Sequence, residues 1–119
     1  MAENTIFKGG CHCGKVRWEA ALDLEHVIGC NCSICSKQGL WISFTLADNF
    51  KLISGEDDLK DYQFGKETIH HLHCTTCGVE SFARGKLPDG TGMIGVNVRC
   101  LDDVGIEELR PVPHDGKSI

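Results

Sequence analysis

The sequence predicts a mainly β fold, formed as a single domain over residues 1–119. The first observation is that many short segments alternate apolar and polar residues with period two, as half-buried strands do. The second is that turn-forming Gly, Asp, Asn and Pro residues separate these segments, and that helical patterning is nearly absent. A chain of 119 residues with 41% hydrophobic residues is typical of one globular domain.

The N-terminal half is expected to contain five strands. Residues 5–8 precede a glycine pair, 16–20 alternate strictly, and 26–28 run into a cysteine-rich loop. Residues 40–46 are rich in the β-branched and aromatic residues that favour strands. A strand at 50–53 follows an Asp-Asn turn, which separates it from its neighbour.

The C-terminal half continues the same pattern with four further strands. Residues 59–64 alternate again, and 68–73 with 79–84 would form a hairpin around a Cys-x-x-Cys turn. Residues 93–99 follow a loop rich in Gly and Pro and are the last expected strand. Residues 101–109 are the only helical candidate, and the tail beyond them should be extended or irregular.

Seven of the eight cysteines fall into three tight clusters. They are Cys11-x-Cys13, Cys30-x-Cys32-x-x-Cys35 and Cys74-x-x-Cys77. Thiols stay reduced in the cytosol, and clustering at ligand spacing favours a metal over disulfides. Thiolate clusters select zinc by default, so the sequence predicts zinc sites. The eighth, Cys100, is expected to be a small buried hydrophobic residue.

Seven ligands divide most economically into one closed site and one open site. The closed site would contain Cys11, Cys13, Cys74 and Cys77, and the open site Cys30, Cys32 and Cys35. One ion would then staple segments about 60 residues apart, and a second would keep an open position, as catalytic zinc does. Another pairing stays open, because either cysteine pair could donate a ligand to the triple. The prediction is a mainly β, zinc-stapled domain with two Zn²⁺ per chain.

Several residues near the clusters could contribute further ligands or line a pocket. His71 and His73 share one face of their strand and could supply a fourth ligand or a proton relay, or be ordinary strand residues. The fourth ligand of the second ion could also be Cys100, a group on a partner protein, or a loosely held small ligand. Trp41 and Phe44 could line a substrate pocket or belong to the sheet core.

Charge and composition exclude several classes of partner. The formal net charge is −5, with 12 basic residues scattered among 17 acidic ones, so nucleic-acid binding is not expected. No run of about 18 apolar residues is present, so no membrane span is expected. Glu3 stands where a signal peptide would carry a base, which predicts a cytoplasmic protein. The sequence gives no signal for an oligomeric state.

The cysteine segments, taken with their glycines, resemble the glutathione-dependent formaldehyde-activating enzyme family, whose domain centromere protein V shares. The matching segments are Gly10-Cys11-His12-Cys13-Gly14-Lys15-Val16, Cys30-Asn31-Cys32-Ser33-Ile34-Cys35 with Gly39, Cys74-Thr75-Thr76-Cys77-Gly78 and Asn97-Val98-Arg99-Cys100-Leu101-Asp102-Asp103. The resemblance implies a small, zinc-stapled antiparallel β assembly of the β-tent type. It also implies a structural zinc at Cys11, Cys13, Cys74 and Cys77 and a catalytic-type zinc at Cys30, Cys32 and Cys35.

The same resemblance implies an activity. The family's named reaction joins formaldehyde and glutathione, so the chain would be a carbon–sulfur lyase-like enzyme acting on a thiol/aldehyde adduct such as S-hydroxymethylglutathione. Its partners would be glutathione or another small thiol and an aldehyde. The alternative is a zinc-binding interaction module whose second zinc is structural. His73 departs from the family pattern, because an aromatic residue often precedes the third cysteine pair.

Overall fold

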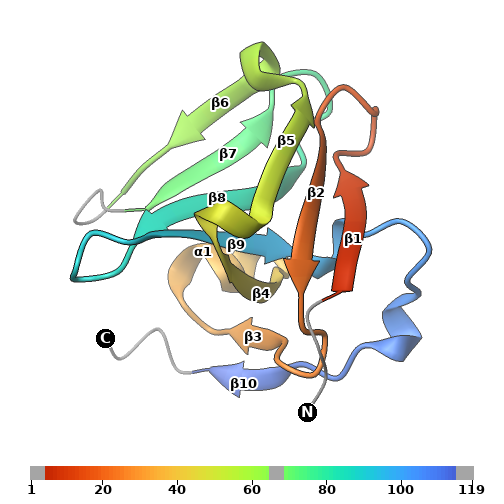
Figure 1. Ribbon diagram of the computed structural model, residues 1–119, viewed down its shortest axis with the longest axis vertical. Helices are drawn as coiled ribbons and strands as arrows, with labels where there is room; N and C mark the ends of the chain where they lie inside the picture. Colours follow the sequence, from red (N-terminus) through yellow and green to blue (C-terminus); the bar gives the residue numbers. More distant parts are fainter. Residues whose placement is uncertain (1–4, 65–68, 115–119) are drawn as a thin grey trace.

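The computed structural model describes residues 5–64 and 69–114, which form two β-sheets (Figure 1). The smaller sheet has the order β1 (Thr5–Gly10), β2 (Arg17–Leu22), β5 (Phe50–Ser54). The larger has the order β10 (Val112–His114), β3 (Ile28–Cys30), β4 (Trp41–Leu46), β9 (Gly92–Asn97), β8 (Glu80–Lys86), β7 (His70–Cys74), β6 (Leu59–Tyr62). Every strand pair is antiparallel except β10 with β3. The predicted mainly β, antiparallel fold is confirmed.

The core lies between the two sheets and follows the period-two pattern of the strands. In β2 the alternate residues Trp18, Ala20 and Leu22 are buried, as the sequence pattern predicts. They pack with buried residues of the larger sheet, including Phe82 and Val96. The indole Nε1–H of Trp18 donates to Ser81 Oγ at 3.0 Å, which satisfies the polar end of the ring inside the core.

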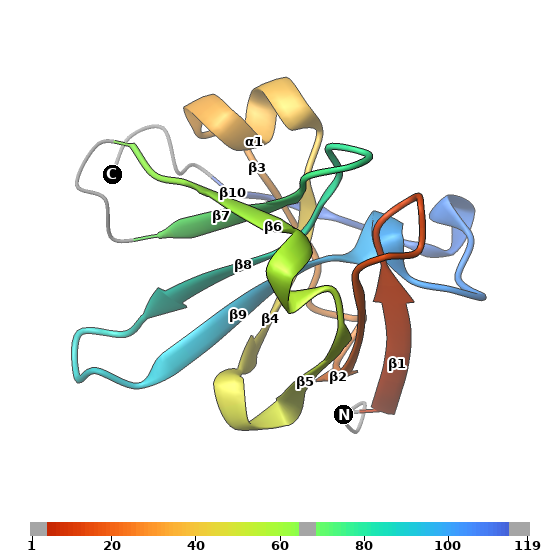
Figure 2. The same ribbon diagram turned by 90° about the horizontal axis from the view of Figure 1, so that it is seen from above.

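The opposite face of the larger sheet carries the one α-helix of the described residues, α1 (Ser33–Gln38). Figure 2 shows α1 on one side of the larger sheet and β1, β2 and β5 on the other. Neither α1 nor the short 3₁₀ turns could cross a membrane, because none is long and apolar enough. One face of the larger sheet therefore packs in the core, and its other face lies on the side of α1.

Two local expectations from the sequence need correction. The three-cysteine segment does not end as a loop but continues into α1, which Gly39 ends in the left-handed conformation with φ 67°. The helical candidate at 101–109 contains only a 3₁₀ turn, Ile106–Glu108. The tail, expected to be extended or irregular, is extended at Val112–His114, where it pairs with β3. Part of the expected strand at 68–73 lies outside the described residues, since position 68 is not described.

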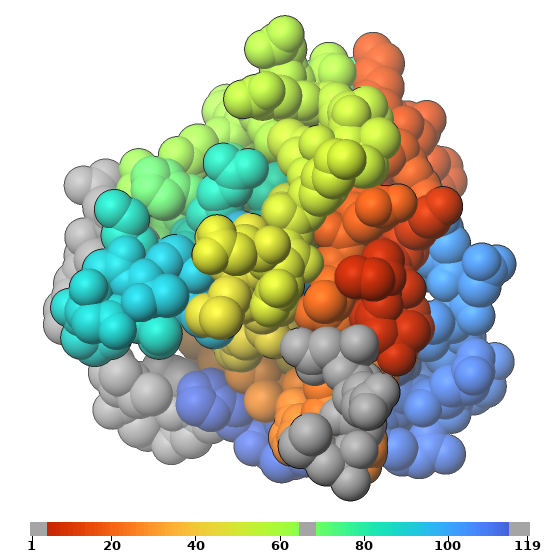
Figure 3. All heavy atoms as spheres, viewed as in Figure 1, coloured from red at the N-terminus to blue at the C-terminus, as the bar shows by residue number. Residues whose placement is uncertain are grey.

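The smaller sheet lies beside the segment that follows β9, as the red and blue residues at the right of Figure 3 show. Gly9 in β1 forms a β-bridge with Leu101, and Arg17 forms an ion pair with Asp102. Gly9 is required here because a Cβ would lie only 2.5 Å from the Cys100 carbonyl oxygen and 2.7 Å from the Trp18 ring. The C-terminal segment therefore closes onto the smaller sheet.

Candidate metal centres and the adjoining cavity

The first cysteine cluster lies where β1 ends and where β7 turns into β8. The sulfurs of its members all lie within 4.8 Å of one another; the members are Cys11, Cys13, Cys74 and Cys77. Cys13 Sγ lies 3.6 Å from both Cys11 Sγ and Cys74 Sγ. Zinc–thiolate bonds of about 2.3 Å in a tetrahedron place neighbouring sulfurs about 3.8 Å apart. The donor set therefore fits a closed four-thiolate metal site.

Backbone N–H groups around this cluster point at the sulfurs and favour the thiolate form. Val16 N–H donates to Cys11 Sγ at 3.3 Å, and Thr76 N–H donates to Cys74 Sγ at 3.4 Å. Burial opposes ionisation of Cys77, but backbone N–H groups, that of Val79 first, lower its pKa to about 6. A lowered thiol pKa reduces the competition between protons and a metal ion for the sulfur.

The second cluster links β3 to α1 and has three members. Cys30 ends β3, Cys32 is the N-cap of α1, and Cys35 lies inside the helix, with the three sulfurs within 4.8 Å of one another. Cys32 N–H donates to Cys30 Sγ at 3.4 Å. Among the described residues, no histidine, carboxylate or further cysteine completes this group. Three thiolates with an open fourth position fit a catalytic type of zinc site.

Cys100 does not belong to the second cluster. It packs against the core, and the thiols that influence its ionisation are Cys11 and Cys77 of the first cluster. Burial raises the pKa of Cys100 to about 12, so the residue is a neutral thiol at physiological pH. This placement agrees with the expectation of a small, largely buried residue and removes Cys100 as a ligand of the second cluster.

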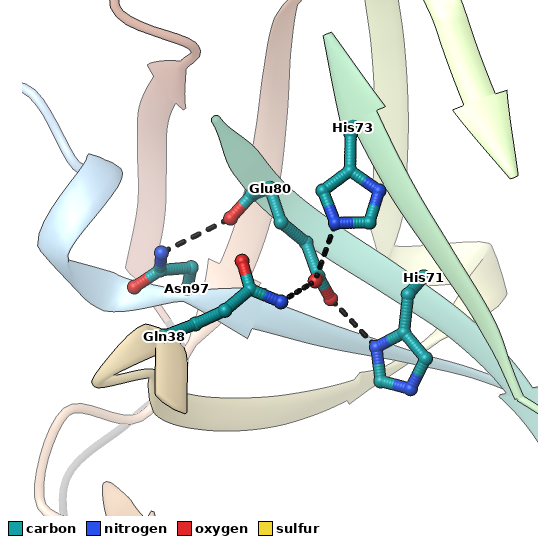
Figure 4. A network of polar contacts seen from close by, with 5 residues as sticks. All are labelled: Gln38, His71, His73, Glu80 and Asn97. Atoms are coloured by element: carbon teal, nitrogen blue, oxygen red, sulfur yellow. Dashed lines mark hydrogen bonds and ion pairs between the residues drawn. The ribbon is translucent and has the colours of Figure 1, made fainter. Parts of the chain in front are cut away.

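A buried polar network lies beside the second cluster and is centred on Glu80 (Figure 4). The Glu80 side chain is 2% exposed, and its Oε2 lies 2.8 Å from His71 Nδ1. Gln38, at the end of α1, donates from Nε2 to Glu80 Oε1 at 2.7 Å, and His73 Nε2 lies 3.4 Å from that same oxygen. Asn97 Nδ2 donates to the Glu80 carbonyl at 3.0 Å. Residues of β7 and α1 thus hold the Glu80 carboxylate in place, and β9 holds its backbone.

A β-bulge explains why Glu80 points at the two histidines. Leu72 lies opposite Phe82, but the next residue of β7, His73, lies opposite Glu80, so Ser81 is an extra residue in β8. Without that residue, the period of two would turn Glu80 into the core. With it, Ser81 faces Trp18 in the core and Glu80 shares a face with His71.

The second cluster and His71 line the same cavity, which has a volume of about 650 Å³. Its floor is the face of the larger sheet opposite the core, and α1 contributes Ile34 and Cys35. Most other lining residues are apolar, and the polar ones include Glu80 and Asn97 at the cluster end. A cavity of this size and character is in the range of small-molecule sites, which are about 300–1,000 Å³.

The structure thus brings together each cysteine set that the sequence grouped, and it separates other candidates. His71 lines the cavity, whereas His73 contacts Glu80 and the ring of Tyr62. Phe44 lines the cavity, and Trp41 instead packs against the core and lies under the Arg99 guanidinium at 4.0 Å. Glu80 and Gln38 went unnoticed in the sequence, because only the bulge and the unexpected helix bring them to the site.

The fold and the clusters define a small antiparallel β domain with two cysteine groups that could hold metal ions, one of them opening into a cavity. Residues 6–115 match the family model described as glutathione-dependent formaldehyde-activating enzyme. The chain belongs to this family. A similar solved structure is the crystal structure of a Rhodobacter sphaeroides protein, a structural genomics target. It is 32% identical, with a TM-score of 0.79, and the match covers 89% of this chain and 97% of that one.

Proposed function

We propose that this chain is a zinc-dependent carbon–sulfur lyase-like enzyme that acts on a thiol/aldehyde adduct such as S-hydroxymethylglutathione. One observation carries the proposal: an open three-thiolate cluster and a buried His71–Glu80 pair line the same cavity. The family supports it, because its described activity concerns formaldehyde and glutathione. A β-tent type of fold, a single domain over 1–119 and a cytoplasmic location belong to the same proposal.

The proposed cofactor set is two Zn²⁺ per chain. A structural ion would bind Cys11, Cys13, Cys74 and Cys77, and a catalytic-type ion Cys30, Cys32 and Cys35. The second ion, when bound, supplies a position that holds a thiol as thiolate at neutral pH. Three thiolates leave that site with a net charge near −1, which suits thiol binding better than activation of water.

His71 is the residue that we assign to proton transfer in the cavity. An ionised carboxylate only accepts hydrogen bonds, so Glu80 fixes the proton of His71 on Nδ1. The lone pair of Nε2 is then the one available to a substrate, and Nε2 has no hydrogen-bond partner among residues 5–64 and 69–114. Glu80 and Gln38 act as positioning residues, since they hold the ring and do not touch the reacting atoms.

The reaction is balanced without an oxidant or reductant. The adduct carries sulfur and a hydroxyl group on one carbon. His71 Nε2 accepts the hydroxyl proton, the C–S bond breaks with its electron pair on sulfur, and the carbon–oxygen double bond forms. The products are an aldehyde and a thiolate, and the reverse sequence joins them, with His71 returning the proton to oxygen.

The test combines ligand binding with turnover. Cobalt(II) replaces zinc, and glutathione is titrated while the visible spectrum and proton release are recorded. The expected result is a spectral change with about one proton released per site. Turnover of S-hydroxymethylglutathione, followed by exchange NMR, should disappear in Cys32→Ser and fall about 10²–10⁴-fold in His71→Ala.

Cys100→Ala is the matched control, because it removes a cysteine that belongs to neither cluster. It should retain both metals, the spectral response and turnover. If the wild-type protein with both metals bound shows neither spectral change nor turnover at millimolar glutathione, the alternative of an interaction module with a structural second zinc replaces the enzyme.

A further inference from the structure

The cavity floor is built from residues with little or no side chain. Ala83 lies opposite Gly95, and Gly85 lies opposite Met93, in the β8–β9 pair. These residues face away from the core, because their neighbours Phe82, Ile94 and Val96 are buried in it. A Cβ on Gly95 would lie 3.3 Å from Ile42 and 3.4 Å from Phe44, and one on Gly85 would lie 3.8 Å from Ile69. The missing side chains leave space between large apolar walls.

The walls of this space are apolar side chains that the protein itself leaves partly uncovered. Phe44 is 54% exposed, Ile69 49% and Leu87 42%, although all three line the cavity. Met93 and Phe64 also contribute. Uncovered apolar surface gathered in a cavity marks a place where an apolar group binds.

The hydrogen-bonded polar groups of the cavity lie at its other end. Near the cysteine cluster, Glu80 accepts hydrogen bonds from His71 and Gln38, and Asn97 donates to the Glu80 carbonyl. On the part of β8 that lines the apolar half, the charged residues are Arg84 and Lys86, and both are exposed. A hydroxymethyl group is far smaller than 650 Å³ and carries little apolar surface, so the formaldehyde part of an adduct does not cover the apolar side chains of the cavity.

From this division we infer that the preferred adduct carries a hydrocarbon or aryl group of roughly six carbons or more, which occupies the cavity between Phe44, Ile69 and Leu87. The inference rests on the proposed function, since the sulfur and the hydroxyl group of the adduct lie at the cysteine cluster and His71. The apolar group belongs either to the aldehyde or to the thiol. In both cases the bond that breaks is the same C–S bond, and the atom balance is unchanged.

Stable thioethers test this preference without any turnover. Calorimetry on the zinc-loaded protein compares S-methylglutathione with S-hexylglutathione, which carries the alkyl group on the aldehyde side of sulfur. Each fully buried methylene raises affinity by up to about fourfold, so S-hexylglutathione should bind about 10- to 1,000-fold more tightly. Methyl hexyl sulfide carries the same alkyl group without the glutathione peptide. If it binds, the protein recognises the apolar group alone, and a simple alkyl thiol can replace glutathione.

Two variants connect that preference to the cavity. Phe44→Ala removes a half-exposed side chain from the cavity wall, and Gly85→Val fills the floor, where Ile69 is the one described residue within 4 Å of a Cβ at position 85. Either variant should reduce the hexyl-over-methyl ratio about tenfold or more. The matched control is Ile6→Ala, which removes an exposed apolar side chain of β1 that does not line the cavity. It should leave the ratio unchanged, and circular dichroism checks that each variant is folded.

The outcomes separate this inference from the proposed function. Equal affinity for the methyl and hexyl ligands, or a hexyl preference that both cavity variants retain, overturns the apolar preference and leaves the lyase proposal intact. Turnover is then compared for glutathione adducts of formaldehyde and heptanal, with kcat/KM expected to follow the same order. If the hexyl preference is present and no adduct is turned over, the lyase proposal fails and the cavity is an apolar binding site.

Discussion

Glu80→Gln is the substitution that tests the polar network most directly. The wild-type carboxylate accepts from two donors, His71 Nδ1–H at 2.8 Å and Gln38 Nε2–H at 2.7 Å. An amide of nearly the same shape keeps one acceptor oxygen and replaces the other with an NH₂ group. The NH₂ group then faces either His71 or Gln38, and that partner must present a lone pair in place of its N–H, in a place where the side chain of residue 80 is 2% exposed.

The expected cost follows from the loss of one hydrogen bond to a charged group. Such a bond contributes about 1.5–3 kcal/mol, so the free energy of unfolding should fall by about that amount. This is smaller than the typical stability of a domain, about 5–15 kcal/mol, so the variant should stay folded. If the NH₂ group faces His71, the imidazole must place its proton on Nε2, and the base is lost. We expect kcat to fall about 10²–10⁴-fold, with a smaller change in KM.

Urea unfolding, metal analysis and turnover of S-hydroxymethylglutathione measure the three consequences separately. Glu25→Gln is the matched control, because it makes the same chemical change at an exposed carboxylate outside the network, and it should change none of them. A loss of stability with unchanged kcat and both metals retained would mean that Glu80 is only a structural clamp. Unchanged stability together with unchanged kcat would contradict the claim that the Glu80 hydrogen bonds stabilise the fold and orient His71.

Three further predictions concern the cysteines. Elemental analysis of freshly purified protein should find two zinc ions per chain, and one or fewer would contradict the two-site proposal. Cys74→Ser should unfold the domain, because a structural zinc contributes on the order of 10–16 kcal/mol. Cys32→Ser should lose one metal ion but stay folded and show a cooperative thermal transition. Thermal melts that show both variants equally unfolded would make the second zinc structural. With a folded-state pKa of about 12, only about 0.1% of Cys100 is ionised at pH 9, against about three-quarters of an ordinary thiol, so iodoacetamide should alkylate it at least 100-fold more slowly. Fast labelling of Cys100 in folded protein at pH 9 would contradict its burial. Because the folded-state pKa of Cys100 is raised, the contribution of its neutral thiol to stability is complete below the ordinary thiol pKa and is lost as pH rises through about 12.

The parts of the structure that the sequence predicts are those with local physical signals. Strict alternation predicts that Trp18, Ala20 and Leu22 face one side, and they do lie in the core. Cysteine spacing predicts the two groups because ligands a few residues apart must reach one ion, and the sulfurs of each group lie within 4.8 Å. The grouping across the chain, Cys13 with Cys74 at 3.6 Å, agrees with the economical division of seven ligands.

The helix after the second cluster has no comparable signal. It contains six residues, and Cys35 is the only buried one, so no apolar periodicity can develop. No side-chain cap begins it, since Cys32 is the N-cap and makes no side-chain capping hydrogen bond. Its one local cue is Gly39, and a single glycine fits a turn equally well. The helix matters because it brings Gln38 to Glu80 and Cys35 to the cluster.

The bulge at Ser81 is the feature on which the proposed chemistry depends most and which no sequence pattern reveals. A strand that alternated regularly from Ala83 back to Glu80 would direct the Glu80 carboxylate into the core, where an unpaired charge costs several kcal/mol. The extra residue in β8 keeps the Glu80 carboxylate out of the core. It turns Ser81 inward, where its hydroxyl accepts the Trp18 N–H, and it turns Glu80 outward to His71. The same bulge therefore satisfies the largest buried side chain of the core and orients the base in the cavity, so a change in β8 register should damage stability and activity together.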